Sequence, residues 1–114
     1  MLIKSVNKEI IKSLENNEEK ALRTLSMIIC SLVEDENYIE GEEKVRKAMC
    51  LYPHSPIPHN LMGILMVKQK NHLLALKHFR AAYALDPTYL PARNNLDQYT
   101  DSTTINNLYH ADPF

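Results

Sequence analysis

Metal binding is the first chemistry to weigh, because the chain contains five histidines and two cysteines. Zinc sites in proteins group imidazole and thiolate ligands at short, characteristic spacings. His54 and His59 lie on either side of two prolines, and the spacing of His72 and His78 puts them on different faces of a helix. These spacings do not match a metal motif. We therefore expect no metal site and no cofactor.

The two cysteines, Cys30 and Cys50, are expected to be reduced thiols. The chain begins with charges where a signal peptide would need an apolar core, so no export segment is recognisable. If residues 19–33 and 37–50 form an antiparallel hairpin, the two cysteines differ in level by roughly 13 Å at about 1.5 Å per residue, beyond the reach of a disulfide. We interpret both as small buried hydrophobic residues.

Motifs for catalysis and for nucleic-acid binding are absent from the sequence. No Ser, Cys or Lys lies in a recognisable nucleophile motif, and two glycines are too few for a phosphate-binding loop. The net charge is −1. One cluster of cations is present and is typical of a solvated helix face: Lys68, Lys70, Lys77 and Arg80. We therefore expect neither an enzyme nor a nucleic-acid-binding protein.

The elements that would position any site are predicted to be helices. The composition is 45% hydrophobic and 24% charged, with two glycines, which is typical of an all-helical protein. Residues 56–87 contain two stretches with apolar residues at helical spacing. Gly63, Ala75 and Ala82 offer little side chain where two helices must approach each other, and Pro87 prevents the second helix from continuing. This stretch therefore predicts one antiparallel helical hairpin.

The same stretch closely resembles the tetratricopeptide repeat (TPR). The residues that carry the resemblance are His59, Met62, Gly63, Met66, Ala75, Phe79, Ala82, Asp86 and Pro87. A degenerate copy lies earlier in the chain, where five residues have counterparts at one constant separation: Asn37 and Asn71, Gly41 and Ala75, Val45 and Phe79, Ala48 and Ala82, Pro53 and Pro87. This separation of 34 residues, called the repeat offset, matches the length of the TPR.

The resemblance implies an all-α fold, an antiparallel helix-hairpin stack or α-solenoid fragment of about five helices. Ile29 stands where the first copy should have its close-approach glycine. A branched side chain at that position keeps two helices further apart, which predicts a wider crossing in the first copy.

The chain is interpreted as one helical domain over residues 1–99. Its predicted parts are a capping helix over 4–15, a degenerate repeat over 19–53, the well-matched repeat over 56–87 and the opening helix of a third repeat over 88–99. Asn16-Asn17 favours a break after the capping helix, and one continuous helix over 4–33 is the alternative. Residues 100–114 are polar and poor in helix formers, so a C-terminal tail is expected.

In this family the first helix of each hairpin lines an inner, concave face. The resemblance implies that this face carries Arg23, Ser26, Cys30 and Val33, then Ile57, Asn60, Ile64 and Val67, and finally Pro91, Asn94 and Gln98. Apart from Arg23 these positions lack the cations with which some family members bind a carboxyl-terminal peptide. A largely apolar, uncharged ligand is therefore expected.

Two asparagines on this face, Asn60 and Asn94, are separated by the repeat offset and so occupy equivalent positions. An amide both donates and accepts hydrogen bonds, so the pair is predicted to hold the backbone of an extended peptide. Selectivity would then come from Ile57, Ile64 and Val67. The alternative is that the N-terminal helix or a second copy covers these residues, and that the asparagines bond to neighbouring backbone.

The resemblance implies a non-catalytic protein–protein interaction module, an adaptor or chaperone-like protein that binds a partner's helix or extended peptide. Two alternatives stay open: a homodimer whose groove is filled by a second copy, and a small chaperone of a secretion or pilus apparatus. A cytoplasmic location is expected, because no signal peptide is recognisable and the uncharged window over 48–67 contains three prolines. We expect proteins as partners, and neither nucleic acid nor a membrane.

Overall fold

Every regular element that the structure describes is a helix. The computed structural model describes residues 2–100 and Phe114, with side chains at Ile10 and from Asn17 onward. Its helices are α1 (Leu2–Glu34), α2 (Tyr38–Leu51), α3 (Pro56–Lys68), α4 (His72–Leu85) and α5 (Leu90–Thr100). Residues 2–100 contain no strand. The prediction of an all-α fold is confirmed.

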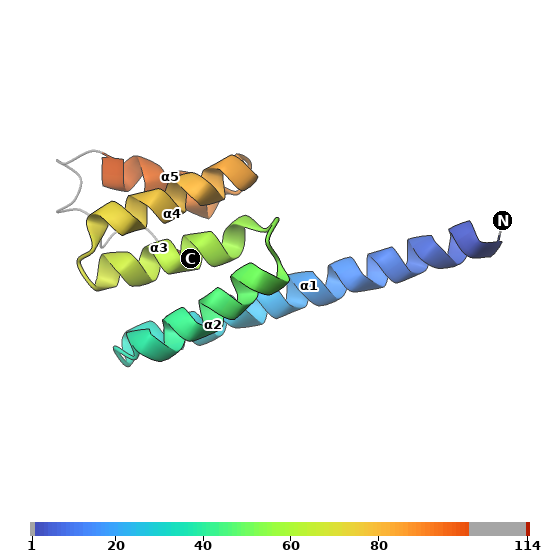
Figure 1. Cartoon of the computed structure of the whole chain (residues 1–114), viewed down its shortest axis with the longest axis horizontal. Coiled ribbons are helices and arrows are strands. Elements are labelled where there is room, and N and C mark those ends of the chain that lie inside the picture. Colours follow the sequence, from blue (N-terminus) through green and yellow to red (C-terminus); the bar gives the residue numbers. More distant parts are fainter. Residues whose placement is uncertain (1, 101–113) are drawn as a thin grey trace.

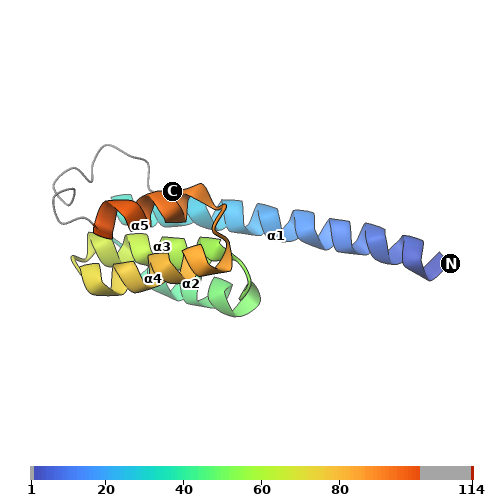
Figure 2. The same ribbon diagram turned by 90° about the horizontal axis from the view of Figure 1, so that it is seen from above.

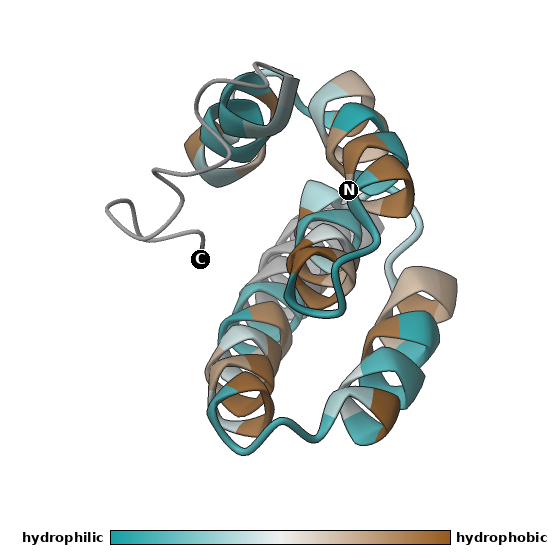
Figure 3. Ribbon diagram, turned by 90° about the vertical axis from the view of Figure 1, so that its left-hand side faces the viewer, coloured by the Kyte–Doolittle hydropathy of each residue, from teal (hydrophilic) through white to brown (hydrophobic). Residues whose placement is uncertain are grey.

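Successive helices run antiparallel and stack as hairpins (Figures 1 and 2). α1 pairs with α2 and α3 with α4, and α5 packs against both helices of the second hairpin. α3 is the central element, because it contacts each of the other four helices. In the view along the long axis, α1, α3 and α5 line one side of the stack, and α2 and α4 lie on the other (Figure 3). The stack therefore has an inner face made by α1, α3 and α5.

The N-terminal part of the chain differs from the sequence prediction. α1 is unbroken from Leu2 to Glu34, so a separate capping helix over 4–15 is wrong and the continuous alternative is right. Asn16 and Asn17 are weak helix formers, but each costs well under about 1 kcal/mol in a helix interior, and neither glycine nor proline interrupts the segment. The first half of α1 projects beyond the hairpins and extends the molecule to 58 Å (Figure 1).

The repeat predicted from the sequence is visible in the helix boundaries. The repeat offset relates the first residues of α2 and α4, Tyr38 and His72, and also their last residues, Leu51 and Leu85. The same offset separates the first residues of α3 and α5, and it also separates the last residues of α1 and α3. The internal repeat of sequence is therefore a repeat of structure.

The turn inside each hairpin repeats as well. Glu36 and Lys70 adopt left-handed backbone conformations, with φ of 57° and 64°. The amide of Asn37 donates to the carbonyl of Leu32 at 2.8 Å. The amide of its counterpart, Asn71, donates to the carbonyl of Met66, also at 2.8 Å. Both first helices thus end in the same Schellman-type closure, which satisfies their last carbonyls.

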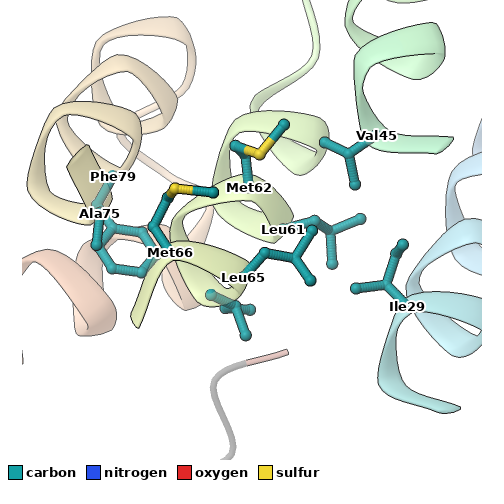
Figure 4. Close-up of a cluster of buried hydrophobic side chains, with 9 residues drawn as sticks. Ile29, Val45, Leu61, Met62, Leu65, Met66, Ala75 and Phe79 are labelled. Atoms are coloured by element: carbon teal, nitrogen blue, oxygen red, sulfur yellow. The ribbon is translucent and has the colours of Figure 1, made fainter. Parts of the chain in front are cut away.

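The hydrophobic core is centred on α3 (Figure 4). Its buried cluster consists of Ile29, Val45, Leu61, Met62, Ile64, Leu65, Met66, Ala75 and Phe79. A Cβ atom added at Gly63 would lie 2.6 Å from Cδ1 of Phe79, well inside van der Waals contact. A Cβ at Gly41 would lie 3.1 Å from Cδ2 of Leu65, which is tight but adjustable. The close approach predicted at Gly63 is therefore confirmed.

α5 is the helix predicted to open a third repeat, and it spans Leu90–Thr100 rather than 88–99. Pro91 is its second residue, where a helix needs no backbone N–H donor. Tyr99 stacks on Phe79 with 5.4 Å between the ring centroids, which attaches α5 to the core. Of the predicted tail, residues 101–113 lie outside the described residues. Phe114 is half-buried and packs against the core cluster, which the sequence did not indicate.

Candidate interaction surface

All of the predicted inner-face residues lie on the three helices that line that face, and most of them are accessible. Those that keep some exposure are Arg23, Ser26, Cys30, Val33, Ile57, Val67, Pro91, Asn94 and Gln98. The guanidinium of Arg23 lies 3.5 Å from the carboxylate of Glu19 on the same helix. The hydroxyl of Ser26 donates to the carbonyl of Leu22 at 3.1 Å, so its donor is used within α1. The accessible part of the face is therefore largely uncharged.

Two predicted inner-face residues are inaccessible, and their assignment as ligand contacts is wrong. Asn60 is 0% exposed and Ile64 is 2% exposed. The side-chain amide of Asn95 donates to Oδ1 of Asn60 at 2.9 Å, and Asn95 is itself buried. Asn94, the partner that sequence register predicts, is exposed on α5. Asn60 therefore joins α3 to α5 inside the molecule instead of facing a ligand.

The burial of Asn60 and Ile64 has a tertiary cause. α5 packs on α3, and Tyr89, just before α5, is hydrogen-bonded to Asn60. Burial raises the pKa of the Tyr89 hydroxyl, and the hydrogen bond with Asn60 opposes part of that rise. Phe114 also packs on the core cluster, and the chain end at this residue lies between α1 and α5 (Figure 3). The middle of the inner face is therefore covered by the chain itself.

The rim of the inner face is more open. Ile57, at the start of α3, lines a shallow depression together with Glu18, Glu19 and Leu22 of α1. At this rim an apolar side chain lies beside two carboxylates.

The structure brings together two histidines that lie far apart in the sequence. Nδ1 of His59 on α3 lies 3.4 Å from Nδ1 of His78 on α4, with the ring centroids 5.7 Å apart. Both rings are half-buried, so desolvation lowers the pKa of each, and the His59 charge lowers the pKa of His78 further. One neutral ring can donate its Nδ1–H to the other, but two protonated rings cannot bond in this geometry. We interpret the pair as a hydrogen bond that closes the α3–α4 hairpin.

In the part of the chain that the structure describes, no group of potential metal ligands is larger than a pair. Within residues 17–100 no three His, Cys, Asp or Glu side chains are placed to hold one ion. His54 lies 2.8 Å from the carboxylate of Glu18, an ion pair that forms when the imidazole is protonated. The remaining described histidine, His72, stacks on Tyr99 with a centroid separation of 6.4 Å. Each described histidine therefore contacts another side chain of the same chain.

The two cysteines are free thiols in different surroundings. Cys30 on α1 is half-buried, and Cys50 is exposed near the end of α2. The interpretation of both as buried residues is therefore wrong for Cys50. Its exposure follows from the register of α2, where Val45 and Ala48 face the core and Cys50 points away from them.

A cleft between α1 and α2 is the feature that sequence reasoning missed. It is lined by Ala21, Thr24, Leu25, Ile28, Lys44, Lys47, Ala48, Leu51 and Tyr52. The signal that could have revealed it is Ile29, which stands in place of a close-approach glycine. At the crossing of α1 and α2, Ile29 and Val45 are both fully buried. A branched side chain on α1 thus occupies the site where the second hairpin has no side chain at all.

None of the described helices combines the length and the apolar character that a bilayer crossing requires. The helix order, the repeated boundaries and the shared turns establish a stack of helical hairpins. A comparison of the chain with protein-family models, with curated proteins and with solved structures found no match in any of the three.

Proposed function

We propose that this chain is a TPR-like, non-catalytic protein–protein interaction module that binds a partner segment along the exposed part of its inner face. The observation that carries the proposal is the side-by-side placement of α1, α3 and α5, which presents accessible residues from three helices on one side. Asn60 and Ile64 are excluded from the contact because they are buried. The proposed contacts are Arg23, Ser26, Cys30, Val33, Ile57, Val67, Asn94 and Gln98.

The chemistry of this surface favours an apolar, uncharged segment, either a helix or an extended peptide. Val33, Ile57 and Val67 supply partly exposed apolar area, and Arg23 is already paired with Glu19. Few charge pairs would form across such an interface, so its affinity should depend weakly on salt. The adaptor and chaperone-like roles and a cytoplasmic location are part of this proposal.

A pull-down with the full chain tests the proposal when it is combined with matched variants. Val67→Glu places a charge on the inner face, and Leu73→Glu places the same charge on α4, where Leu73 is 66% exposed. A partner captured by the wild type and by Leu73→Glu, but not by Val67→Glu, supports the inner face. Equal capture by both variants would remove this face from consideration.

A homodimer is the second candidate, and the projecting part of α1 is the observation that favours it. Ile10 lies on that part of the helix and is 50% exposed. A second copy could pair with this segment and bury the side chain. Light scattering at two protein concentrations separates the candidates, because a dimer doubles the mass and Ile10→Glu would restore the monomer. A role as a chaperone for a secretion or pilus subunit is a third candidate, and the identity of a captured partner would decide it.

A further inference from the structure

The cleft between α1 and α2 has an apolar floor that is open to solvent. Leu25 and Ile28 of α1 face Ala48 and Leu51 of α2 across a volume of about 430 Å³. Ile28 is 39% exposed and Leu51 is 69% exposed. A concave apolar site of this size lies within the range of ligand-binding clefts.

The same place in the second hairpin is closed, and the residues related by the repeat offset show why. Leu25 corresponds to His59, and Lys44 corresponds to His78. The two histidines meet at 3.4 Å between their Nδ1 atoms, whereas Leu25 and Lys44 cannot bond to each other. Ile28 corresponds to the buried Met62. The α1–α2 cleft therefore lies at positions that in the second hairpin are closed by the histidine pair and by packing against the first hairpin.

The rim of the cleft is cationic. Lys44 and Lys47 belong to the lining, and Arg46, Lys47 and Leu51 line an adjoining hollow on α2. None of the described residues that line the cleft is acidic. Lys44 lies 3.9 Å from Glu40, a long ion pair, and no described carboxylate lies within ion-pair distance of Lys47. The apolar floor therefore lies beside positive charge that is incompletely neutralised.

We propose that the α1–α2 cleft binds an acidic amphipathic helix of a partner protein. Apolar side chains at helical spacing would enter the cleft and cover Ile28 and Leu51, while carboxylates on the flanks of the same helix would pair with Lys44 and Lys47. Charge complementarity selects this occupant, since a basic helix would bring like charges together. The inference rests on the proposed function, because both require a protein partner, and it assigns a second surface away from the inner face.

The experiment uses the full chain and two synthetic probes. One is a labelled amphipathic helix of about 14 residues with Leu at i, i+3, i+4 and i+7 and Glu at the flanking positions; the other has Lys in place of Glu. Fluorescence anisotropy should show the Glu peptide binding at least about tenfold more tightly than the Lys peptide at low salt, with the difference shrinking as salt is added. Equal binding of the two peptides, or binding of neither, would overturn the proposal.

Matched variants locate the site. Leu51→Glu should weaken binding of the Glu peptide at least about tenfold, whereas Leu85→Glu, at the equivalent position of the second hairpin, should change it less than about twofold. Both leucines are exposed, so both variants should keep the wild-type melting temperature. Binding that survives Leu51→Glu would contradict the inference. Val67→Glu separates the two proposals, because it should remove inner-face capture and leave this peptide bound.

Discussion

The two hairpins share their boundaries and turns, and they differ in the side chains at the point where their helices cross. In the second hairpin Gly63 of α3 lies against Phe79 of α4, so a large side chain fills the space that a missing one leaves. In the first hairpin the equivalent residues are Ile29 of α1 and Val45 of α2, both buried. In the second hairpin the large side chain at the crossing belongs to the second helix, whereas in the first hairpin the first helix carries the larger side chain, Ile29. Equivalent backbones can thus be packed by opposite distributions of side-chain volume.

This exchange has a consequence for the surface. Where Gly63 allows close approach, the positions equivalent to Leu25 and Ile28 are occupied by His59, which contacts His78, and by Met62, which is buried in the core cluster. Where Ile29 stands, the edge between α1 and α2 opens into the cleft that begins at Leu25. The difference between Ile29 and Gly63 at the crossing point therefore coincides with a solvent-accessible cleft between α1 and α2.

The largest expected effect is at the tightest crossing. Gly63→Leu should destabilise the fold by about 3 kcal/mol or more, because its side chain would overlap the ring of Phe79 and overpacking already costs roughly 1–3 kcal/mol where neighbours can shift. Gly41→Leu should cost less, because the flexible end of Leu65 can move. Urea unfolding compares the two variants. The opposite order would mean that the close contact had been assigned to the wrong hairpin.

Removing bulk from the first crossing should be the next largest effect. Ile29→Ala should cost about 2–4 kcal/mol, since it leaves a cavity in a fully buried site. Adding Val45→Phe supplies bulk from the other helix, as in the second hairpin, and should recover part of the loss. A double-mutant cycle from chemical unfolding measures the coupling, which we expect to reach about 1 kcal/mol. Strictly additive effects would show that volume is not exchangeable across this crossing.

α3 makes a buried polar contact with α5 but not with α1 among the described residues. Asn60 and Asn95 join α3 to α5, while their counterparts in the preceding repeat, Ser26 and Leu61, form no such pair between α1 and α3. Asn60→Ala should cost about 1–3 kcal/mol, because the buried amide of Asn95 loses its acceptor. The exposed Asn94→Ala should change stability by less than about 0.5 kcal/mol. Thermal unfolding of both variants tests this, and equal melting temperatures would contradict the buried pair.

A pH dependence should distinguish the hairpins through the histidine pair. Folding lowers the pKa of His59 and of His78 below the ordinary value of 6.5. The unfolded chain therefore binds more protons at acidic pH, so stability is lost as pH falls through 6.5 toward the lowered folded-state values. His78→Gln should flatten the dependence of the melting temperature between about pH 7 and 5. His72→Gln, whose ring lies outside the pair, is the control and should keep the wild-type slope.

The smallest expected effect concerns the shared turns. Glu36 and Lys70 both adopt left-handed backbone, which costs a non-glycine residue roughly 1–2 kcal/mol, whereas glycine adopts it freely. After the greater entropy of an unfolded glycine is subtracted, Glu36→Gly and Lys70→Gly should each stabilise by up to about 1 kcal/mol. Melting temperatures should rise by similar amounts. A gain in one hairpin alone would show that the turns are not equivalent.

The sequence by itself determined the helices, their repeat and the tightest contact. Helix boundaries follow from local signals: Pro56 and Pro91 lie in the first turn of their helices, and Asp86-Pro87 ends α4. The register of the repeat follows from small residues at fixed spacing. A close approach at Gly63 is predictable because a residue without a side chain lets the neighbouring helix come near, whereas Phe79 as its neighbour follows only from the structure.

Only the tertiary structure decided which polar and apolar groups remain available. Local propensity could not tell whether Asn16-Asn17 breaks α1, because two weak helix formers cost little in a segment that neither glycine nor proline interrupts. Asn60 lies on the predicted inner face, but α5 and Tyr89 cover it. The contact of His59 with His78 and the cleft beside Leu25 each depend on how far apart two helices stand. The side chains of both helices set this distance together, so the spacing of residues along one helix cannot predict it.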